Sequence, residues 1–465
     1  MKTKFTSMEK QEIIVKCHET LGYLSYQNHS FGIGGVNSLP IPPRVSSGIK
    51  ALKPKLVRIF LQEFFYIYPD HNVFNWDKMD AYLEAVHTAG ADIMAHITIK
   101  PKPLYPVIDE TIWKPNDVKE WQGVIETMVR RYSLEKKYIS HWAVANEINI
   151  GELGGCPYKF TSPHDYFEYY KMTAQAIIKA CPGVKVGGPA WAGTGEVPAA
   201  FFGVFFDLVK KEKLRLDFIS YNMYTDIPQE HVEAAKLFRQ IADKYDKNLE
   251  LYTTEFNVRL DSEIAFEENA YAGARAASLA ASILAMQEAQ YVNGTFQYHI
   301  VDQHNSVNEF SPFYKITRYM AEHWNDFPHR LGLFDWDGNP RPQYFMYKLL
   351  YGMDGERLSL GSGGNEHIHA AASSSGNRDI NIFISNYHDE NPKDIISRLC
   401  LKNNPASLYR LTVYRIDNEK RWDETLELKP VEDRLTYMAD DFSFLVFTPA
   451  DSVTLICLKS LEAAN

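Results

Sequence analysis

The chain has 465 residues, enough for a barrel of about 250 residues together with a smaller second domain. Hydrophobic residues make up 45% of it and charged residues 23%, as in ordinary globular proteins, and no segment offers the roughly 20 apolar residues of a membrane span. The net charge of −10 argues against a nucleic-acid partner, because Lys210–Lys213 is only a short mixed run.

The first twenty residues mix charged and polar side chains with short apolar pairs and lack the continuous apolar core of a signal peptide. We therefore expect a cytoplasmic protein. The cysteines are widely spaced and form no CxxC pair, which predicts reduced, mostly buried thiols and neither a disulfide framework nor a zinc site. They are Cys17, Cys156, Cys181, Cys400 and Cys457.

Short β-rich apolar runs alternate with amphipathic stretches up to about residue 347, which is typical of βα units and a parallel sheet. Eight runs can be placed, the number that closes a TIM barrel, so we predict a catalytic (β/α)8 barrel over residues 31–347. The runs are Phe31–Val36, Leu56–Leu61, Asp92–Thr98, Ile139–Asn146, Val184–Pro189, Asp217–Met223, Leu249–Glu255 and Gly294–Ile300.

The stretches between these runs carry helix signals. Pro163 follows Ser162 at a first-turn position, apolar residues then recur at helical spacing, and Pro182-Gly183 ends the helix. A second helix places Trp76, Met79, Leu83 and Val86 on one face and ends at Gly90. Both helices are expected to cover the outside of the sheet.

After about Tyr347 the apolar period changes to two, as in Ile380, Ile382 and Ile384. Similar short runs separated by Asn, Pro and Gly predict an antiparallel β-sandwich over residues 348–465. An apolar run near the start, Ile13–Cys17, precedes the first barrel strand, so residues 1–30 are expected to pair with this β-sandwich.

Two glutamates stand at the ends of predicted barrel strands. Glu147 ends the fourth run and Glu255 the seventh, and the C-terminal edge of barrel strands is where active sites are built. Retaining glycoside hydrolysis needs two carboxyl groups about 5–5.5 Å apart, one to protonate the leaving oxygen and one to attack the anomeric carbon. Either glutamate alone is better explained by a salt bridge at a strand end, whereas the pair with its neighbours favours catalysis.

Asn146-Glu147 and Glu255, at the ends of these strands, resemble the signature of the clan A retaining glycosidases, and the chain is most similar to glycoside hydrolase family 39, the β-xylosidase and α-L-iduronidase family. Supporting stretches occur in the family's order: Leu56–Ile59, Phe74–Trp76, Lys100–Leu104, Lys185–Ala190, Asp217–Ser220, Thr254–Asn257, Gly332–Phe334, Asp337-Gly338 and Arg341-Pro342. The resemblance implies a barrel with a trailing sandwich, a carbohydrate substrate and no cofactor.

The resemblance also implies roles for further residues. Asn146 would hydrogen-bond the substrate 2-hydroxyl, Arg58 would hold Glu255 in its charged form, and Tyr224 would hydrogen-bond the same carboxylate. For Arg58 and Tyr224, ordinary structural pairing at the barrel rim is an equally good interpretation. Glu147 has to stay protonated near neutral pH, which burial and the charged partner would favour.

The sequence departs from the family around the catalytic pair. Ala145 and Ile148 flank Asn146-Glu147 where the family has Trp and Pro, Asn222 replaces a helper histidine, and Tyr298 replaces the tryptophan that commonly forms the floor of the sugar site. These changes leave the identity of the sugar open. Weaker candidates for substrate contacts are Gln297, His299, Trp191 and the loop Ile150–Gly155, although packing is the better interpretation of each.

His367-Ile368-His369 places two imidazoles on one face of a strand, an arrangement that could bind a metal. Without a third ligand nearby, an exposed strand is the better interpretation, and no cofactor motif is present. We therefore predict no metal.

Our hypothesis is an exo-acting, β-xylosidase-like glycosidase that removes a terminal sugar from oligosaccharides or glycoconjugates. An endo-acting polysaccharide hydrolase, a catalytically silent carbohydrate-binding barrel and a non-glycosidase barrel enzyme are the alternatives. A homo-oligomer is compatible with an appended sandwich, but nothing in the sequence fixes a symmetry.

Overall fold

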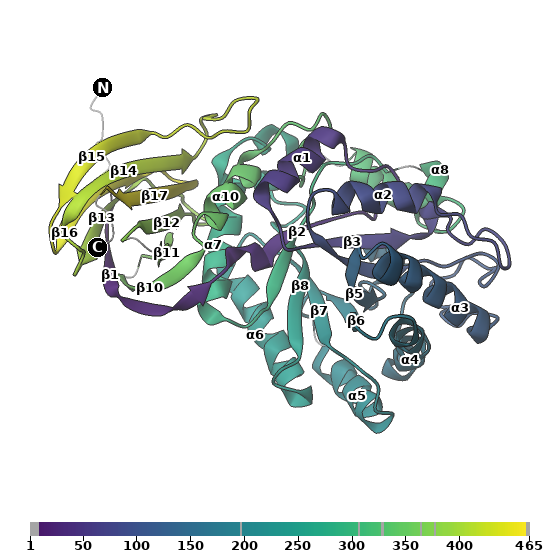
Figure 1. Ribbon diagram of the computed structural model, residues 1–465. Coiled ribbons are helices and arrows are strands. Elements are labelled where there is room, and N and C mark those ends of the chain that lie inside the picture. Colours follow the sequence, from purple (N-terminus) through teal and green to yellow (C-terminus); the bar gives the residue numbers. More distant parts are fainter. Residues whose placement is uncertain are drawn as a thin grey trace.

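The computed structural model describes residues 9–195, 198–305, 307–326, 330–362, 365–375 and 378–461. Two bodies share a long boundary (Figure 1): a closed barrel of eight parallel strands and a separate, mostly antiparallel sheet of nine strands. The predicted fold class, a TIM barrel with an appended β-sandwich, is confirmed.

The barrel strands follow one another in sequence order around the closed sheet. They are β2 (His29–Ile33), β3 (Leu56–Gln62), β4 (Asp92–Thr98), β5 (Ile139–Val144), β6 (Lys185–Ala192), β7 (Phe218–Tyr224), β8 (Glu250–Asn257) and β9 (Gly294–Tyr298). Each overlaps one of the predicted runs, because strands buried on both faces appear in the sequence as nearly continuous apolar segments.

Helices surround the barrel strands, as expected for βα units (Figure 1). The Ser162 hydroxyl caps α4 by accepting from the backbone N–H groups of His164 and Asp165, and the helix then ends at Ala180. The helices are α1 (Pro43–Leu52), α2 (Asp77–His87), α3 (Val118–Val129), α4 (Pro163–Ala180), α5 (Pro198–Lys211), α6 (Pro228–Tyr245), α7 (Gly273–Ala289), α8 (Val307–Phe310), α9 (Thr317–Ala321) and α10 (Pro342–Tyr351).

The second sheet has a hydrophobic core of its own. Residues from several of its strands form this core, among them Ile13, Leu399 and Ile456. Its order is β15-β14-β17-β12-β11-β10-β1-β13-β16. The strands are β1 (Glu9–Leu24), β10 (Gly355–Ser362), β11 (Ile368–Ser374), β12 (Ile380–Asn386), β13 (Ile395–Lys402), β14 (Ser407–Ile416), β15 (Glu432–Met438), β16 (Phe442–Thr448) and β17 (Ser452–Ser460).

Strand β1 is an inner strand of this sheet, third from the β16 edge, antiparallel to β10 and parallel to β13. The parallel pair means that the sheet is not purely antiparallel. Helix α10 runs across residue 347, and the domain limits given above remain predictions.

The sheet packs on the barrel through α7. Along β12 the residues Ile380, Ile382 and Ile384 face the sheet's own core, as their alternation predicts. The alternating residues Phe383 and Ser385 of β12 are on the other face, toward the barrel. Phe383 belongs to the large core that includes the barrel, and Ser385 Oγ donates to the backbone carbonyl of Ala277 in α7 at 2.7 Å. One strand therefore joins two cores.

All five cysteines are free thiols, and Cys156, Cys181 and Cys400 are buried. Of the helices in the described parts of the chain, none has the length and apolar character needed to cross a membrane.

Candidate active site

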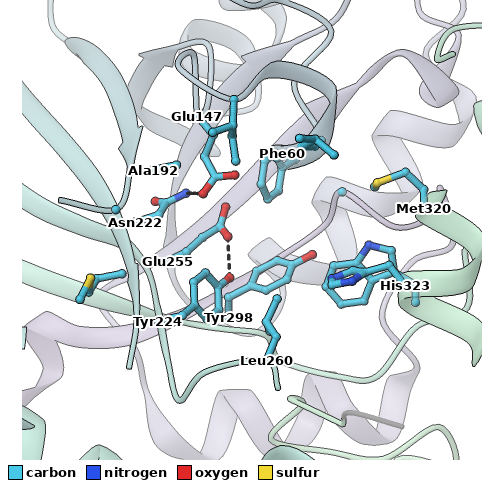
Figure 2. A pocket seen from close by; sticks show the side chains of 18 of the residues that line it. Phe60, Glu147, Ala192, Asn222, Tyr224, Glu255, Leu260, Tyr298, Met320 and His323 are labelled. Carbon is cyan, nitrogen blue, oxygen red and sulfur yellow. Dashed lines mark hydrogen bonds between the residues drawn. The ribbon is translucent and has the colours of Figure 1, made fainter. Parts of the chain in front are cut away.

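Glu147 and Glu255 reach one cavity from opposite parts of the barrel (Figure 2). Glu255 belongs to β8, and Glu147 follows the end of β5. The backbone at Ala145 and Glu147 has positive φ values of 70° and 41°, which non-glycine residues rarely adopt. This turn redirects the chain at the strand end and points the Glu147 side chain into the cavity, a type of local strain that clusters at functional sites.

Arg58 of β3 lies beneath the pair, fully buried. Its Nη1 lies 3.0 Å from Glu255 Oε1, and its Nη2 donates to Asn146 Oδ1 at 2.7 Å. The guanidinium also lies 3.7 Å from the centre of the Phe60 ring. A buried cation needs an ionic partner, so this contact favours a charged carboxylate at Glu255.

Two neighbouring residues of β7 fix the two carboxyl groups. Asn222 Nδ2 donates to Glu147 Oε1 at 2.9 Å, and Tyr224 Oη donates to Glu255 Oε2 at 2.6 Å (Figure 2). Asn222 is itself oriented by Thr254, whose hydroxyl donates to its Oδ1 at 2.8 Å. Each carboxyl group therefore has at least one fixed hydrogen-bond donor.

Burial in the barrel and the negative charge of Glu255 raise the pKa of Glu147 to about 8, although the hydrogen bond from Asn222 and the charge of Arg58 act in the opposite direction. Glu147 thus holds its proton at neutral pH. The two carboxyl groups differ in what surrounds them, one beside a cation and one beside an anion, and such a pair can divide acid and charged roles between its members.

The cavity has a volume of about 350 Å³, and its lining is mostly apolar. Besides the two glutamates, Asn222 and Tyr224 it is lined by Gly35, Phe60, Ile150, Leu153, Gly154, Gly155, Ala192, Gly193, Met223, Leu260, Tyr298, Tyr319, Met320, His323 and Trp324. Aromatic rings on one side, such as Tyr298 and Trp324, have the flat surfaces that cover the apolar faces of sugars.

Gly154 leaves the room that Glu147 occupies. A Cβ atom built on Gly154 would lie 2.7 Å from Glu147 Cβ, closer than Cβ contacts in real proteins, and would also collide with the carboxyl oxygen Oε2. The loop after β5 therefore fits the acid only with glycine at this position.

The structure brings most of the sequence-predicted residues together at this cavity. Some of them line it, and others are buried beneath it. Glu147, Glu255, Asn222, Tyr224 and Tyr298 line it. Arg58 and Asn146 lie beneath it, fully buried, and Asn146 Nδ2 donates to the carbonyl of Gly154 at 3.1 Å. Asn146 therefore joins Arg58 to the loop after β5, and a contact with a substrate hydroxyl remains a prediction.

Three weaker candidates lie outside the cavity lining. Trp191 packs against Phe201 of α5, with ring centres 5.1 Å apart. Gln297 is buried within β9, and His299 Nε2 lies 3.6 Å from Asp302 Oδ1. The ring contact fits the packing interpretation of Trp191, and a substrate contact of Gln297 or His299 remains a prediction.

Several lining residues were not predicted from the sequence. Phe60 and Met223 lie near the C-terminal ends of β3 and β7, where strand position alone could have indicated them. Tyr319, Met320, His323 and Trp324 come from α9 and the π-helical turn that follows it, Glu322–Asp326. No motif marks that segment.

The histidine pair is arranged differently from the sequence expectation. His367 meets His388 and Glu366, not His369, and potential ligand atoms of these three residues lie within 4.8 Å of one another. His388 Nε2 lies 3.8 Å from Glu366 Oε1, whereas a tetrahedral zinc ion with bonds of about 2.1 Å holds its ligands roughly 3.4 Å apart. Glu366 is also exposed, and we assign no metal to this group.

Comparison with known proteins gives the family. The sequence matches the model of glycosyl hydrolases family 39 over residues 55–420. The chain belongs to this family. The match covers the barrel strands from β3 onward, including both glutamates, and extends into the second sheet.

The family 39 chain is similar to two named β-xylosidases. It is 25% identical over 296 residues to the one from Caldicellulosiruptor saccharolyticus, which covers 60% of this chain and 55% of that protein. It is 27% identical over 128 residues to the one from Geobacillus stearothermophilus, and this alignment covers 25% of this chain and 24% of that protein. The alignments thus span about half and a quarter of these relatives.

Two solved structures share the fold over nearly the whole chain. A monomeric β-xylosidase from Caulobacter crescentus CB15 has a TM-score of 0.74 at 18% identity and covers 97% of this chain and 100% of its own. A glucosidase from Croceicoccus marinus has a TM-score of 0.72 at 20% identity and covers 98% and 100%.

We expect Glu255→Gln to lower the pKa of Glu147 below about 8, because the substitution removes the neighbouring negative charge that helps to raise it. The value should stay above the ordinary 4.5, since burial, the larger cause, remains. Carboxyl carbon NMR titration of glutamate-labelled protein measures both values. Glu212→Gln, which removes a remote exposed carboxyl, is the control, and an unchanged Glu147 pKa in Glu255→Gln would contradict the coupling.

Proposed function

We propose that this family 39 protein is a retaining, exo-acting β-glycosidase with Glu147 as general acid/base and Glu255 as nucleophile. The observation that carries the proposal is the unequal pair in one cavity. Glu255 lies against the buried cation of Arg58, while the pKa of Glu147 is raised to about 8. Double displacement requires one carboxyl of each kind.

In the first step, the Glu255 carboxylate attacks the anomeric carbon while the bond to the leaving oxygen breaks and Glu147 delivers its proton to that oxygen. The sugar is then an ester of Glu255, whose negative charge is gone. The pKa of Glu147 loses one of its raising causes, so the residue, now deprotonated, can take a proton from water. Water attacks the anomeric carbon, and Glu255 leaves as carboxylate.

Arg58 and Tyr224 position the nucleophile in this scheme. Arg58 lies against Oε1 and Tyr224 binds Oε2, so the carboxylate is held from both sides. Holding the attacking group in place before reaction accounts for much of the rate advantage of an enzyme.

The glycone is assigned to the side of the cavity formed by β9, β2 and β3, where Tyr298, Gly35 and Phe60 line the wall. Tyr319, Met320 and Trp324 line the cavity from the segment Thr317–Asp326. The ring centres of Trp324 and Tyr298 lie 5.7 Å apart, and a cavity closed on this side by these rings would hold one terminal sugar, which favours exo action. The names of the relatives, both β-xylosidases, support a xylose-like glycone.

Glu255→Ala should lower kcat for a 4-nitrophenyl β-xyloside by roughly 10³-fold or more, because no nucleophile remains. Added azide should restore turnover and give the α-glycosyl azide, as it enters from the face that Glu255 has vacated. Chiral product analysis by NMR checks the anomer. A silent carbohydrate-binding barrel would show no wild-type turnover, with this xyloside or any other sugar in a nitrophenyl glycoside panel.

Gly154→Ala should lower kcat by about 10²-fold, because the added methyl displaces the Glu147 side chain and a misplacement of about 1 Å has that effect. Gly195→Ala is the matched control, since a Cβ there meets nothing within 4 Å. Circular dichroism and thermal unfolding verify that both variants fold. Equal activity of the two variants would show that Gly154 does not set the position of the acid.

The exo assignment predicts that xylose is the first product released from a xylooligosaccharide of six units, with five-unit product appearing at the same rate. Chromatography of early time points measures this. Early fragments of two to four units would instead identify an endo-acting hydrolase.

A further inference from the structure

The part of the cavity next to Glu147 has an apolar wall. It is formed by the loop after β5 and by the ends of β6 and β7, and its described residues carry no charged or hydrogen-bonding side chain. This wall, called here the acid-side wall, consists of Ile150, Leu153, Gly154, Ala192, Gly193 and Met223.

The acid-side wall is where the leaving group has to lie if the proposed function holds. Glu147 protonates the oxygen between the two halves of the substrate, so one half extends over Glu255 and the other past Glu147. The glycone half is assigned to the wall near Tyr298. The remaining half of the substrate therefore contacts the residues around Glu147, which are those of the acid-side wall.

Polar side chains next to this wall already use their donors. Asn222 Nδ2 donates to Glu147 Oε1 at 2.9 Å and lies 3.4 Å from Asn146 Oδ1, while the Tyr224 hydroxyl donates to Glu255. Asn149, behind the wall, is bound through both of its amide atoms to the backbone of Ala192. Among the described residues, a second sugar would thus find no side-chain donor on this wall for its hydroxyl groups.

Leu153 adds an independent observation. Its side chain lines the cavity mouth and remains 54% exposed, and large apolar residues at the rim of a cavity commonly mark a ligand surface. Ala192 and Gly193 on the same wall are small, and a Cβ atom built on Gly193 meets nothing within 4 Å. Space bounded by a leucine, an isoleucine and a methionine favours an apolar group by the hydrophobic effect.

We propose that the acid-side wall is a subsite for an apolar, aryl-bearing leaving group, so that glycosides of phenols or aryl-substituted alcohols are preferred over oligosaccharides. Methionine and leucine side chains pack well on aromatic rings, and the acid-side wall offers one of each, Met223 and Leu153. Selectivity for such glycosides comes from burial of the ring, without any new polar contact.

The test compares three glycosides of one sugar, whichever gives the highest turnover in a panel of 4-nitrophenyl β-glycosides. The leaving groups are methanol, 2-phenylethanol and a second sugar residue. Methanol and 2-phenylethanol have similar acidity, so the ratio of their kcat/KM values reports contacts of the ring and not leaving-group chemistry. We expect the 2-phenylethyl glycoside to exceed the methyl glycoside at least about tenfold, from burial of roughly 60 Å² or more of apolar surface.

Leu153→Gln should bring this ratio down to below about threefold, because it places an amide where the ring would lie. Leu134→Gln is the matched control, a half-exposed leucine outside the cavity lining, and should leave the ratio and both rates unchanged. A higher kcat/KM for the disaccharide than for the 2-phenylethyl glycoside, or an unchanged ratio in Leu153→Gln, would overturn the inference. Absence of hydrolysis across the nitrophenyl panel would instead overturn the proposed function itself.

Discussion

The buried guanidinium of Arg58 is the constraint on which the site depends. A fully buried cation in the barrel needs a compensating anion, and Glu255, 3.0 Å away, is placed to be that anion. Burial of Glu147, together with the negative charge of Glu255, raises the pKa of Glu147 to about 8. The two carboxyl groups therefore differ in their surroundings, because Glu255 lies against the Arg58 cation whereas Glu147 is buried beside an anion.

The register of the barrel strands brings Arg58, Glu147 and Glu255 together. Asn222 is the register partner of Glu255 on the neighbouring strand, yet its side chain binds Glu147, so a single residue of β7 relates both carboxyl groups. Asn146, just after β5, meets Arg58 of β3 in the same way. These contacts join β3, β7 and β8 to the turn just after β5, and the loop that follows takes part through the Gly154 carbonyl, which accepts from Asn146. The reacting groups therefore stand at strand ends, whereas part of the substrate-facing surface comes from loops.

The barrel and the glutamate pair were predictable because both leave local marks in the sequence. Strands such as β4 (Asp92–Thr98) are buried on both faces and appear as apolar runs, and a glutamate ending such a run points to the active edge. Residues brought in from distant loops leave no such mark. Met320 and Trp324 line the cavity from a segment without a motif, and His388 reaches His367 only through the β11–β12 pairing. The ring of Trp191, a weaker candidate for a substrate contact, packs against Phe201 of α5.

The loop after β5 connects the chemistry to the choice of substrate. Within five residues it supplies part of the acid-side wall through Ile150 and Leu153 and the space for Glu147 through Gly154. Its carbonyl at Gly154 also accepts from Asn146, which ties the loop to Arg58 beneath the cavity. A change of leaving group can therefore be accommodated at Leu153, whose side chain is directed to the mouth, without disturbing the acid. The same freedom does not extend to Gly154, because there any side chain would contact Glu147 first.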